Sequence, residues 1–325
     1  MKDKILVNIP TDEALRARMR AAAPAFEFYF LENSEDYAEV FAEARIVFGK
    51  FYPKNLPYPA KLEWAQVVSS GVDRYVVPGA LPKNAILTSG TGAYDVIISE
   101  FMVAQLLSLS YNLPRYRDHQ NNLVWGDLGY PSSIAGKTIL LFGLGSIGAA
   151  FAKKMKDFGA YVIGVRRSVR AKPDCVDEVY TFDDPALNAQ FARADAVAMC
   201  VPETPETIHI LNDARIRGLK PSAVVINVGR GSAIEQDALI QALKEKRIAG
   251  AALDVTTPEP LPKDNPLWTF ENVLLTPHIA GHDYAFDVLP KTIETFFYNL
   301  EAFQQGRPMR RVIDRTLRYC AVKDE

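Results

Sequence analysis

Residues 138–148 read Thr-Ile-Leu-Leu-Phe-Gly-Leu-Gly-Ser-Ile-Gly, a short apolar run followed directly by three glycines with the spacing GxGxxG. The apolar run predicts a buried strand, and the residues from Ile147 to Phe158 have a helical pattern. A strand, a glycine-rich turn and a helix in this order are typical of a dinucleotide-binding βαβ unit. The stretch therefore predicts a doubly wound parallel α/β sheet with a nucleotide at the turn.

Each part of this motif has a physical role. Gly143 permits the tight turn, Gly145 lets a pyrophosphate approach the backbone, and Gly148 allows the helix to pack closely on the strand. The N–H groups at the start of the helix, at Ser146 and Ile147, are expected to face the phosphates. The alternative is a glycine-rich turn that holds no ligand.

The end of the next predicted strand indicates which dinucleotide the turn would hold. NAD sites carry an acidic residue here that accepts from the ribose 2′-hydroxyl. This sequence instead has Arg166, Arg167 and Ser168, which would donate to a 2′-phosphate. We therefore favour NADP over NAD, with solvated arginines and acceptance of NAD as the alternative.

Working outward, short β-rich runs alternate with helical patterns in two series, which favours two α/β domains with parallel sheets. Thr11-Asp12-Glu13 and Ser34-Glu35-Asp36 each supply an N-cap and an acidic first turn for a helix. The predicted helices are 11–23, 34–44, 99–113 and 285–305. The predicted strands are 5–8, 26–31, 46–48, 65–68 and 86–88 in the first series, and 138–142, 161–165, 196–201, 223–228, 249–255 and 273–275 in the second.

Three chemically matched side chains follow successive strands of the second series. Arg230 lies in INVGRG (226–231), Glu259 in LDVTTPEPL (253–261) and His278 in LTPHIAG (275–281). Ligands of open α/β sheets bind just past the carboxyl ends of the strands. The set therefore predicts one site that holds a base or acid, a carboxylate and a guanidinium.

This set suits the reduction of a 2-keto acid. Arg230 can pair with the substrate carboxylate and polarise its carbonyl. His278 can donate a proton to the oxygen when hydride arrives, because histidine titrates near neutral pH. Glu259, if it lies beside His278, would favour the imidazolium form. Each residue alone has a structural alternative, such as a strand-end cap, but their joint occurrence favours catalysis.

Composition excludes several other classes. The chain has 325 residues, 48% hydrophobic and 23% charged residues and a net charge of −2, as in a soluble two-domain protein without a nucleic-acid-binding field. Cys175, Cys200 and Cys320 are scattered, which argues against disulfides and zinc, and no His/Cys/Asp/Glu spacing suggests a metal. The apolar run at Ile5 is too short for a signal peptide, and none reaches the roughly 18 residues of a membrane span. We expect a cytoplasmic protein.

On these residues the sequence resembles the D-isomer-specific 2-hydroxyacid dehydrogenase family over nearly its whole length. The motifs that carry the resemblance are the glycine fingerprint, NVGRG with Arg230, LDV and PEPL with Glu259, and TPHI with His278. The segment from Pro114 to Trp125 resembles the glyoxylate/hydroxypyruvate reductase branch.

The resemblance implies a flavodoxin-like substrate domain that is discontinuous, at 1–98 plus 286–325, and a Rossmann domain at 99–285. It also implies a homodimer joined through the cofactor domains, and a cleft that closes on the substrate. By motif, the backbone of Ser70 and Gly71 would hold the substrate carboxylate. The remaining cofactor contacts implied by the resemblance are Cys200, Val201, Pro202, Thr207, Val228, Gly229, Arg230, Asp254 and His278.

Departures from the family pattern narrow the substrate. Glu259 replaces the glutamine of formate dehydrogenases, and the loop 48–51 lacks an arginine for a substrate phosphate, although Lys50 could replace it. The chain ends near the last predicted helix, so we expect no regulatory domain of the phosphoglycerate dehydrogenase kind. The role of His282 and the identity of the 2-keto acid stay open.

The leading hypothesis is an NADPH-dependent reductase of glyoxylate or hydroxypyruvate that gives the D-2-hydroxy acid. The alternatives are a NAD-linked phosphoglycerate or D-lactate dehydrogenase and, more distantly, a non-catalytic scaffold that senses the nucleotide.

Overall fold

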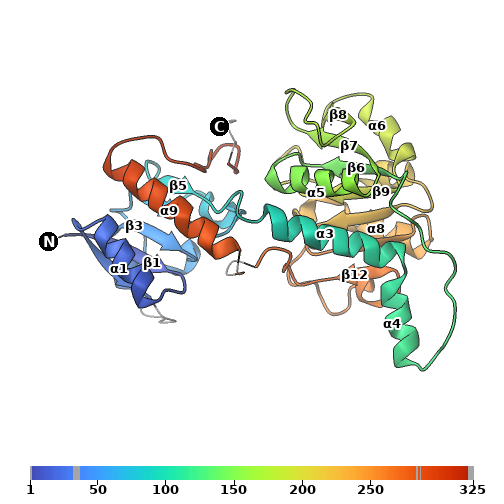
Figure 1. Cartoon of the computed structure of the whole chain (residues 1–325), viewed down its shortest axis with the longest axis horizontal. Helices are drawn as coiled ribbons and strands as arrows, with labels where there is room; N and C mark the ends of the chain where they lie inside the picture. Colours follow the sequence, from blue (N-terminus) through green and yellow to red (C-terminus); the bar gives the residue numbers. More distant parts are fainter. Residues whose placement is uncertain (1, 32–36, 283–284, 286, 321–325) are drawn as a thin grey trace. The chain divides into compact units, whose positions relative to one another are not determined.

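The computed structural model describes residues 2–31, 37–282, 285 and 287–320 (Figure 1). Two compact units are present, one formed by Met1–Tyr94 with His282–Glu325 and the other by Asp95–Gly281. The sequence placed the boundaries after residues 98 and 285. The difference at the first boundary arises because one continuous helix, α3 (Asp95–Ser110), begins before the predicted start at residue 99.

The first unit has a parallel sheet with the order β2-β1-β3-β4-β5 among its described residues. This is the flavodoxin-like order. Its strands are β1 (Asp3–Asn8), β2 (Phe26–Phe30), β3 (Ala44–Gly49), β4 (Trp64–Gln66) and β5 (Ile86–Thr88). Its helices are α1 (Glu13–Ala22), α2 (Ala38–Glu43) and α9 (Val288–Gln304), with short 3₁₀ turns at Pro53–Asn55 and Asp73–Tyr75.

Local signals set the helix starts in this unit. The Asp12 side chain accepts from the Leu15 backbone N–H at 2.7 Å, which caps α1 as the sequence predicted. The N-cap predicted at Ser34 for the second helix lies outside the described residues.

The last helix explains why the first unit is discontinuous. One face of its sheet, with Phe48 and Trp64, packs on Phe296 of α9, and the ring centroids lie 4.2 and 5.3 Å apart. Arg18 of α1 donates to Glu294 of α9 at 2.7 Å. Burying an aromatic side chain contributes roughly 1.5–3 kcal/mol to the free energy of folding. The return of the chain to this sheet is therefore stabilised by the aromatic face that α9 covers.

The second unit has a parallel sheet with the order β12-β11-β10-β9-β6-β7-β8 among its described residues. The strands are β6 (Thr138–Phe142), β7 (Tyr161–Arg166), β8 (Glu178–Thr181), β9 (Ala196–Met199), β10 (Val224–Asn227), β11 (Gly250–Leu253) and β12 (Val273–Leu275). The helices besides α3 are α4 (Leu113–Asn121), α5 (Ser146–Asp157), α6 (Leu187–Gln190), α7 (Asp213–Arg217) and α8 (Gln236–Lys244). Short 3₁₀ turns occupy Phe191–Arg193, Gly231–Ala233 and Pro266–Thr269.

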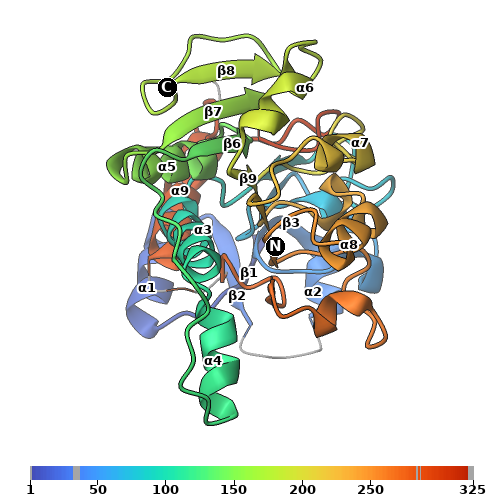
Figure 2. The ribbon, with the colours of Figure 1, turned by 90° about the vertical axis from the view of Figure 1, so that its right-hand side faces the viewer.

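Helices cover both faces of this second sheet. Side chains of α7 and α8, such as Ile216 and Leu239, join one buried cluster with Leu140 and Val225. The opposite face packs on α3 and α5 (Figure 2). The alternation of strand and helix confirms the predicted α/β fold with two parallel-sheet domains. Because strand order reverses between β6 and β9, the carboxyl ends of these two strands form the switch point where such sheets bind ligands.

Two features differ from the sequence-based expectation. Strand β8 was not predicted, because it is short, begins with the charged Glu178 and is half-buried at the edge of the sheet. Strands β9 and β11 end at Met199 and Leu253, before the predicted 201 and 255. Their pairing stops there because the neighbouring strands end: β6 and β10 for β9, and β10 and β12 for β11.

Among the described residues, no single helix is long and apolar enough to cross a membrane. Helices α3 and α4 meet the length and composition test only when taken together, and they are bent by 63° at their junction.

Candidate active site

The carboxyl edge of the seven-stranded sheet carries most of the predicted site residues. The glycine turn follows β6, and Val201 and Pro202 follow β9. Strand β7 ends at Arg166, and Arg167 and Ser168 come directly after it. Arg230, Glu259 and His278 follow β10, β11 and β12 in turn. The parallel register of neighbouring strands brings these loops to one edge.

The glycine turn has the geometry that a dinucleotide requires. Gly143 has φ 101°, a conformation that disfavours any side chain. A Cβ on Gly148 would lie 1.8 Å from the Gly143 carbonyl oxygen, so only glycine lets α5 approach β6 this closely. A Cβ on Gly145, the N-cap of α5, would meet nothing within 4 Å. The open space beside the first turn of α5 fits a pyrophosphate.

Cys200, the residue after β9, contacts this turn through its thiol. The Cys200 Sγ donates to the carbonyl oxygens of Phe142 and Gly143, at 3.4 and 3.2 Å. Burial raises the pKa of the Cys200 thiol to about 12, so it stays protonated and unreactive at neutral pH. Cys200, which the sequence predicted as a cofactor contact, therefore lies against the glycine turn as a protonated thiol.

Hydrogen bonds of a threonine hydroxyl group stabilise the segment after β9. The Thr207 hydroxyl donates to the Pro202 carbonyl at 2.7 Å, and it accepts from the Thr204 N–H at 2.8 Å. Val201 and Thr207 are buried, while Pro202 is half-buried. The Thr207 side chain thus shapes the segment that contains Pro202 and Thr207, two of the predicted cofactor contacts.

The two arginines at the end of β7 have different surroundings. The Arg166 guanidinium donates to the backbone carbonyls of Arg170, in a short contact, and of Ala171 at 3.1 Å. It therefore closes the loop that follows the strand. The Arg167 charge acts on Glu206, whose pKa is lowered first by a hydrogen bond from Thr204 and, among smaller causes, by Arg167. Ser168 is exposed on the same loop.

The loop with Arg230 is tightly organised. The Asn227 side chain donates to the Arg230 carbonyl at 2.8 Å and accepts from the Gly229 N–H at 3.0 Å. The Arg230 guanidinium donates to the Gly229 carbonyl at 2.7 Å. Val228 and Gly229 are buried, and Arg230 is half-buried. The backbone of this loop is thus fixed before any substrate binds.

Glu259 and His278 form the predicted pair. The Glu259 Oε2 atom lies 2.9 Å from the Nδ1 atom of His278, and Glu259 Oε1 accepts from the Thr256 N–H at 3.1 Å. Partial burial raises the pKa of Glu259, but the hydrogen bonds from His278 and Thr256 and the charges of His278 and Arg230 outweigh it. The net pKa lies below the ordinary value, so Glu259 is ionised at neutral pH.

This pair is accessible as well as ordered. The His278 and Glu259 side chains are 49% and 40% exposed. Because Glu259 occupies Nδ1, Nε2 is the ring nitrogen that can serve a substrate. The dependence of the Glu259 pKa on Arg230 places the guanidinium within electrostatic reach of the pair.

Asp254 holds the turn that carries His278. This 2% exposed residue accepts from the Thr276 hydroxyl at 2.6 Å and from the N–H groups of Ile279 and Ala280, each at 2.9 Å. Its backbone carbonyl accepts from the His278 N–H at 2.9 Å. The sequence predicted Asp254 as a cofactor contact and did not identify this role. The available signal was an aspartate directly after an apolar strand, at the end of the strand next to the one that His278 follows.

The first unit carries the loop predicted to bind a carboxylate. The Ser69 hydroxyl donates to the Gly71 carbonyl at 2.8 Å, and the Ser70 Oγ lies 3.4 Å from the Thr91 hydroxyl. Ser70 and Gly71 are half-buried at the carboxyl end of β4. Lys50 follows the neighbouring strand β3, so it lies at the same edge of that sheet.

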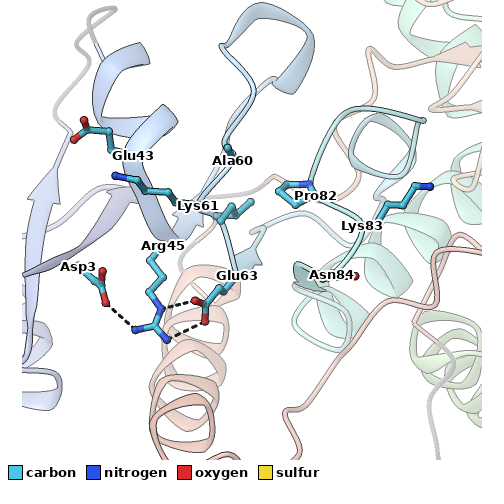
Figure 3. A pocket seen from close by; sticks show the side chains of 10 residues that line it. Asp3, Glu43, Arg45, Ala60, Lys61, Glu63, Pro82, Lys83 and Asn84 are labelled. Carbon is cyan, nitrogen blue, oxygen red and sulfur yellow. Dashed lines mark hydrogen bonds and ion pairs between the residues drawn. The ribbon is translucent and has the colours of Figure 1, made fainter.

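A cavity of about 480 Å³ lies at the opposite, amino-terminal edge of this five-stranded sheet. Figure 3 shows Arg45 between Asp3 and Glu63, to which it donates at 2.8 and 2.9 Å. Parallel sheets bind their ligands at the other edge, and these carboxylates already have a partner. We assign this cavity no role in the site. Among the described residues, no group of three or more His, Cys, Asp or Glu side chains could hold a metal ion.

Residues 103–280 match the family model of the D-isomer specific 2-hydroxyacid dehydrogenase NAD-binding domain. A family member from Aeromonas salmonicida has a crystal structure that is 33% identical, with a TM-score of 0.84 over 97% of this chain and 100% of that one. An NADPH-dependent glyoxylate/hydroxypyruvate reductase from Sinorhizobium meliloti, in complex with NADP and sulfate, is 25% identical, with a TM-score of 0.80 over 98% and 100%.

A glyoxylate reductase from Thermofilum pendens is 36% identical over 218 residues, which span 66% of this chain and 64% of that protein. These similarities confirm the resemblance, including that to the glyoxylate/hydroxypyruvate reductase branch. With its seven-stranded nucleotide-binding unit and its Arg, Glu and His on successive strand ends, this chain belongs to the D-isomer specific 2-hydroxyacid dehydrogenase family.

Proposed function

We propose that this protein reduces a small 2-keto acid to the D-2-hydroxy acid with NADPH, by means of Arg230, Glu259 and His278. The observation that carries the proposal is the 2.9 Å contact between Glu259 Oε2 and His278 Nδ1, within electrostatic reach of Arg230. The contact leaves one ring nitrogen of His278 for proton transfer, and Arg230, whose charge acts on Glu259, is assigned to the substrate carboxylate.

The residues divide the reaction between them. Arg230 binds the carboxylate and polarises the neighbouring carbonyl group. When bound at the glycine turn, a reduced nicotinamide would supply the hydride for the carbonyl carbon. His278 donates the proton from Nε2 to the carbonyl oxygen, which completes the hydroxyl group. Glu259, ionised at neutral pH, stabilises the imidazolium before the transfer. In the reverse direction His278 takes the proton from the hydroxyl group.

The preference for NADP rests on the end of β7. Arg167 and Ser168 are proposed to bind the 2′-phosphate, and Arg166 to hold the loop in place through the carbonyls of Arg170 and Ala171. The segment with Glu206 lies within reach of the Arg167 charge, which supports the placement of Arg167 on the adenosine side. The pyrophosphate is assigned to the turn with Gly145 and to the first turn of α5.

For the substrate we propose glyoxylate or hydroxypyruvate, held in part by the backbone of Ser70 and Gly71 in the first unit. The reductase names of two relatives support this choice. The loop at 49–51 supplies Lys50 but no arginine for a phosphate, which weighs against a phosphoglycerate dehydrogenase.

We also propose that the protein is a homodimer joined through the cofactor-binding unit. Helix α4 has no buried residue among those described and projects from the unit in both views, and the segment that follows returns toward β6 (Figures 1 and 2). Leu123, Trp125 and Tyr130 are exposed there. A cytoplasmic location is proposed from the free thiols at Cys175, Cys200 and Cys320.

A panel of 2-keto acids, followed by the loss of reduced-nicotinamide absorbance, tests this proposal. Glyoxylate, hydroxypyruvate, pyruvate and phosphohydroxypyruvate are each assayed with NADPH and with NADH. We expect the highest kcat/KM for glyoxylate or hydroxypyruvate with NADPH. Oxidation of neither cofactor by any substrate would contradict the proposed reduction, and a clear preference for NADH with phosphohydroxypyruvate would favour the alternative.

A further inference from the structure

Beyond the three residues at the catalytic centre, a carboxylate on the segment after β9 contacts the loop that carries Arg230. The Ser232 hydroxyl donates to Glu203 Oε2 at 2.5 Å. This distance is typical of a charge-assisted hydrogen bond from a hydroxyl group to an ionised carboxylate. Both side chains are half-buried, so water competes only partly for this hydrogen bond.

Ser232 lies in the 3₁₀ turn Gly231–Ala233, for which Arg230 is the N-cap residue. The Ala233 N–H donates to the Arg230 carbonyl at 3.1 Å. This 3₁₀ turn therefore sets the direction of the Arg230 side chain. The Glu203 side chain stabilises the same turn through Ser232.

The two segments are also packed backbone to backbone. A Cβ on Gly229 would lie 2.6 Å from the Val201 carbonyl oxygen, so the loop before Arg230 rests directly on the segment that precedes Glu203. On the other side, a Cβ on Gly231 would lie 2.1 Å from the Thr256 carbonyl oxygen. The Arg230 loop is thus held between the segments that lead to Glu203 and to Glu259.

Segment 202–207 is rigid enough to act as a support. Thr207 ties it together through the Pro202 carbonyl and the Thr204 N–H, and both threonines are buried. In addition, the His209 N–H donates to the Ser232 carbonyl at 2.8 Å. Movement of Ser232 is consequently restricted at its hydroxyl and at its carbonyl.

We propose that Glu203 is a positioning residue for Arg230, which fixes the substrate-binding guanidinium through the hydrogen bond from Ser232. The inference rests on the proposed function, because Arg230 is assigned there to the substrate carboxylate. Glu203 does not contact the substrate in this account, so its loss weakens the binding of the 2-keto acid more than it weakens the binding of the cofactor.

The test compares Glu203→Ala, Ser232→Ala, the double variant and Glu203→Gln in steady-state reduction of glyoxylate. We expect each alanine variant to raise KM about tenfold, which corresponds to about 1.4 kcal/mol, with a smaller change in kcat. The double variant is expected to be no worse than either single one, because both changes remove the same contact. Glu203→Gln keeps an acceptor oxygen and should restore most of the affinity.

Glu245→Ala is the matched control, because that carboxylate binds Arg247 at the C-cap of α8 and is not part of the site. NADPH affinity, measured by fluorescence titration, should stay within about twofold of wild type in all variants. The affinity for oxalate with NADPH bound gives the same comparison without turnover, so it applies even if the wild type reduces no keto acid.

Wild-type activity with an unchanged KM and oxalate affinity in Glu203→Ala would overturn the positioning role and leave the proposed function intact. Additive effects of the two alanine substitutions, or an equal loss of NADPH affinity, would also overturn it. Absence of turnover in the wild type would count against the proposed function instead.

Discussion

At the scale of single residues, His278 combines an unfavourable backbone with well-satisfied contacts. Its φ is 56°, a left-handed conformation that costs a residue with a side chain of order 1 kcal/mol. The hydrogen bonds from Thr276, Ile279 and Ala280 to the buried Asp254 carboxylate stabilise this turn. The buried Asp254 carboxylate thus stabilises the strained backbone of His278, and this conformation fixes the direction of the His278 side chain.

Replacement of Glu259 by glutamine should change how the reaction responds to pH. The depressed pKa of Glu259 keeps it charged at all pH values above its usual range, where it favours the protonated imidazole. Glu259→Gln keeps a hydrogen-bond acceptor but removes this charge. We expect kcat for reduction to fall at least tenfold, by roughly 1.4 kcal/mol or more, and the alkaline loss of activity to begin at lower pH. A pH profile of kcat that matches the wild type would contradict the electrostatic role.

The two arginines after β7 should separate into a ligand and a loop support. Arg167→Ala is expected to raise the KM for NADPH by roughly tenfold or more, as loss of a hydrogen bond to a charged group does, while the KM for NADH changes little. Arg166→Ala should weaken both cofactors, because it releases the carbonyls of Arg170 and Ala171. Steady-state kinetics with both cofactors measures this. If the ratio of kcat/KM for NADPH to kcat/KM for NADH is the same in both variants as in the wild type, the loop after β7 is not a phosphate site.

The sequence identified the residue types of this site but not their contacts. The spacing of Arg230, Glu259 and His278 past successive strands was enough to group them, because parallel strands end at one edge. It could not distinguish Arg166 from Arg167, since the direction of each side chain depends on how the loop 167–171 folds. Asp254 was assigned to the cofactor by resemblance alone, and its hydrogen bonds to the turn that carries His278 could not be read from the sequence.

At the scale of elements, the edge strand β8 carries a cluster of hydrogen bonds around the Glu178 carboxylate, in addition to the packing of Tyr180 on the core. Glu178 accepts from Arg193 at 2.7 Å and from the hydroxyl groups of Tyr161 and Tyr180, each at 2.6 Å. These hydrogen bonds, the first from Arg193, lower the pKa of Glu178 to about 2. Sequence patterns missed this strand because they register alternating apolar residues, whereas its stability comes from side chains brought together only in the folded sheet.

Glu178→Gln should therefore destabilise the protein at neutral pH and do so less in acid. The folded-state pKa of Glu178 is depressed, so its stabilising contribution is complete above the unfolded-state value of 4.5 and is lost as pH falls toward 2. The cluster is partly exposed, which limits the effect to about 1 kcal/mol, or a Tm lower by about 2–4 °C. Thermal denaturation at pH 7 and pH 4 measures the difference. A gap between the Tm values of variant and wild type that widens toward pH 4 would contradict this assignment.

At the scale of the whole molecule, the return of the chain explains the division into two units. The discontinuous first domain was expected from resemblance, because periodicity alone cannot show which sheet a final helix covers. Stacking of Phe296 on Phe48 and Trp64 supplies the physical reason. The domain boundary shifted because α3 is one uninterrupted helix from Asp95.

The exposed apolar segment after α4 should mediate self-association. Leu123 and Trp125 are 94% and 106% exposed, which is unusual for large apolar side chains that lie close together. We expect the double variant Leu123→Ser, Trp125→Ser to sediment as a monomer and the wild type as a dimer, with Val169→Ser as an exposed apolar control elsewhere in the same unit. Light scattering coupled to size exclusion measures the mass. A variant that remains a dimer would exclude this segment from the interface.

The most direct test of the proposed reaction is the turnover of His278→Ala with NADPH and glyoxylate, beside Glu245→Ala as a control at the C-cap of α8, outside the site. Loss of a general acid typically costs 10²–10⁴-fold in rate. We expect a fall in kcat of about that size for His278→Ala, with NADPH affinity close to that of the wild type, and wild-type kinetics for Glu245→Ala. A His278→Ala protein that binds NADPH and still turns over glyoxylate within about tenfold of the wild-type rate would contradict the central role of His278.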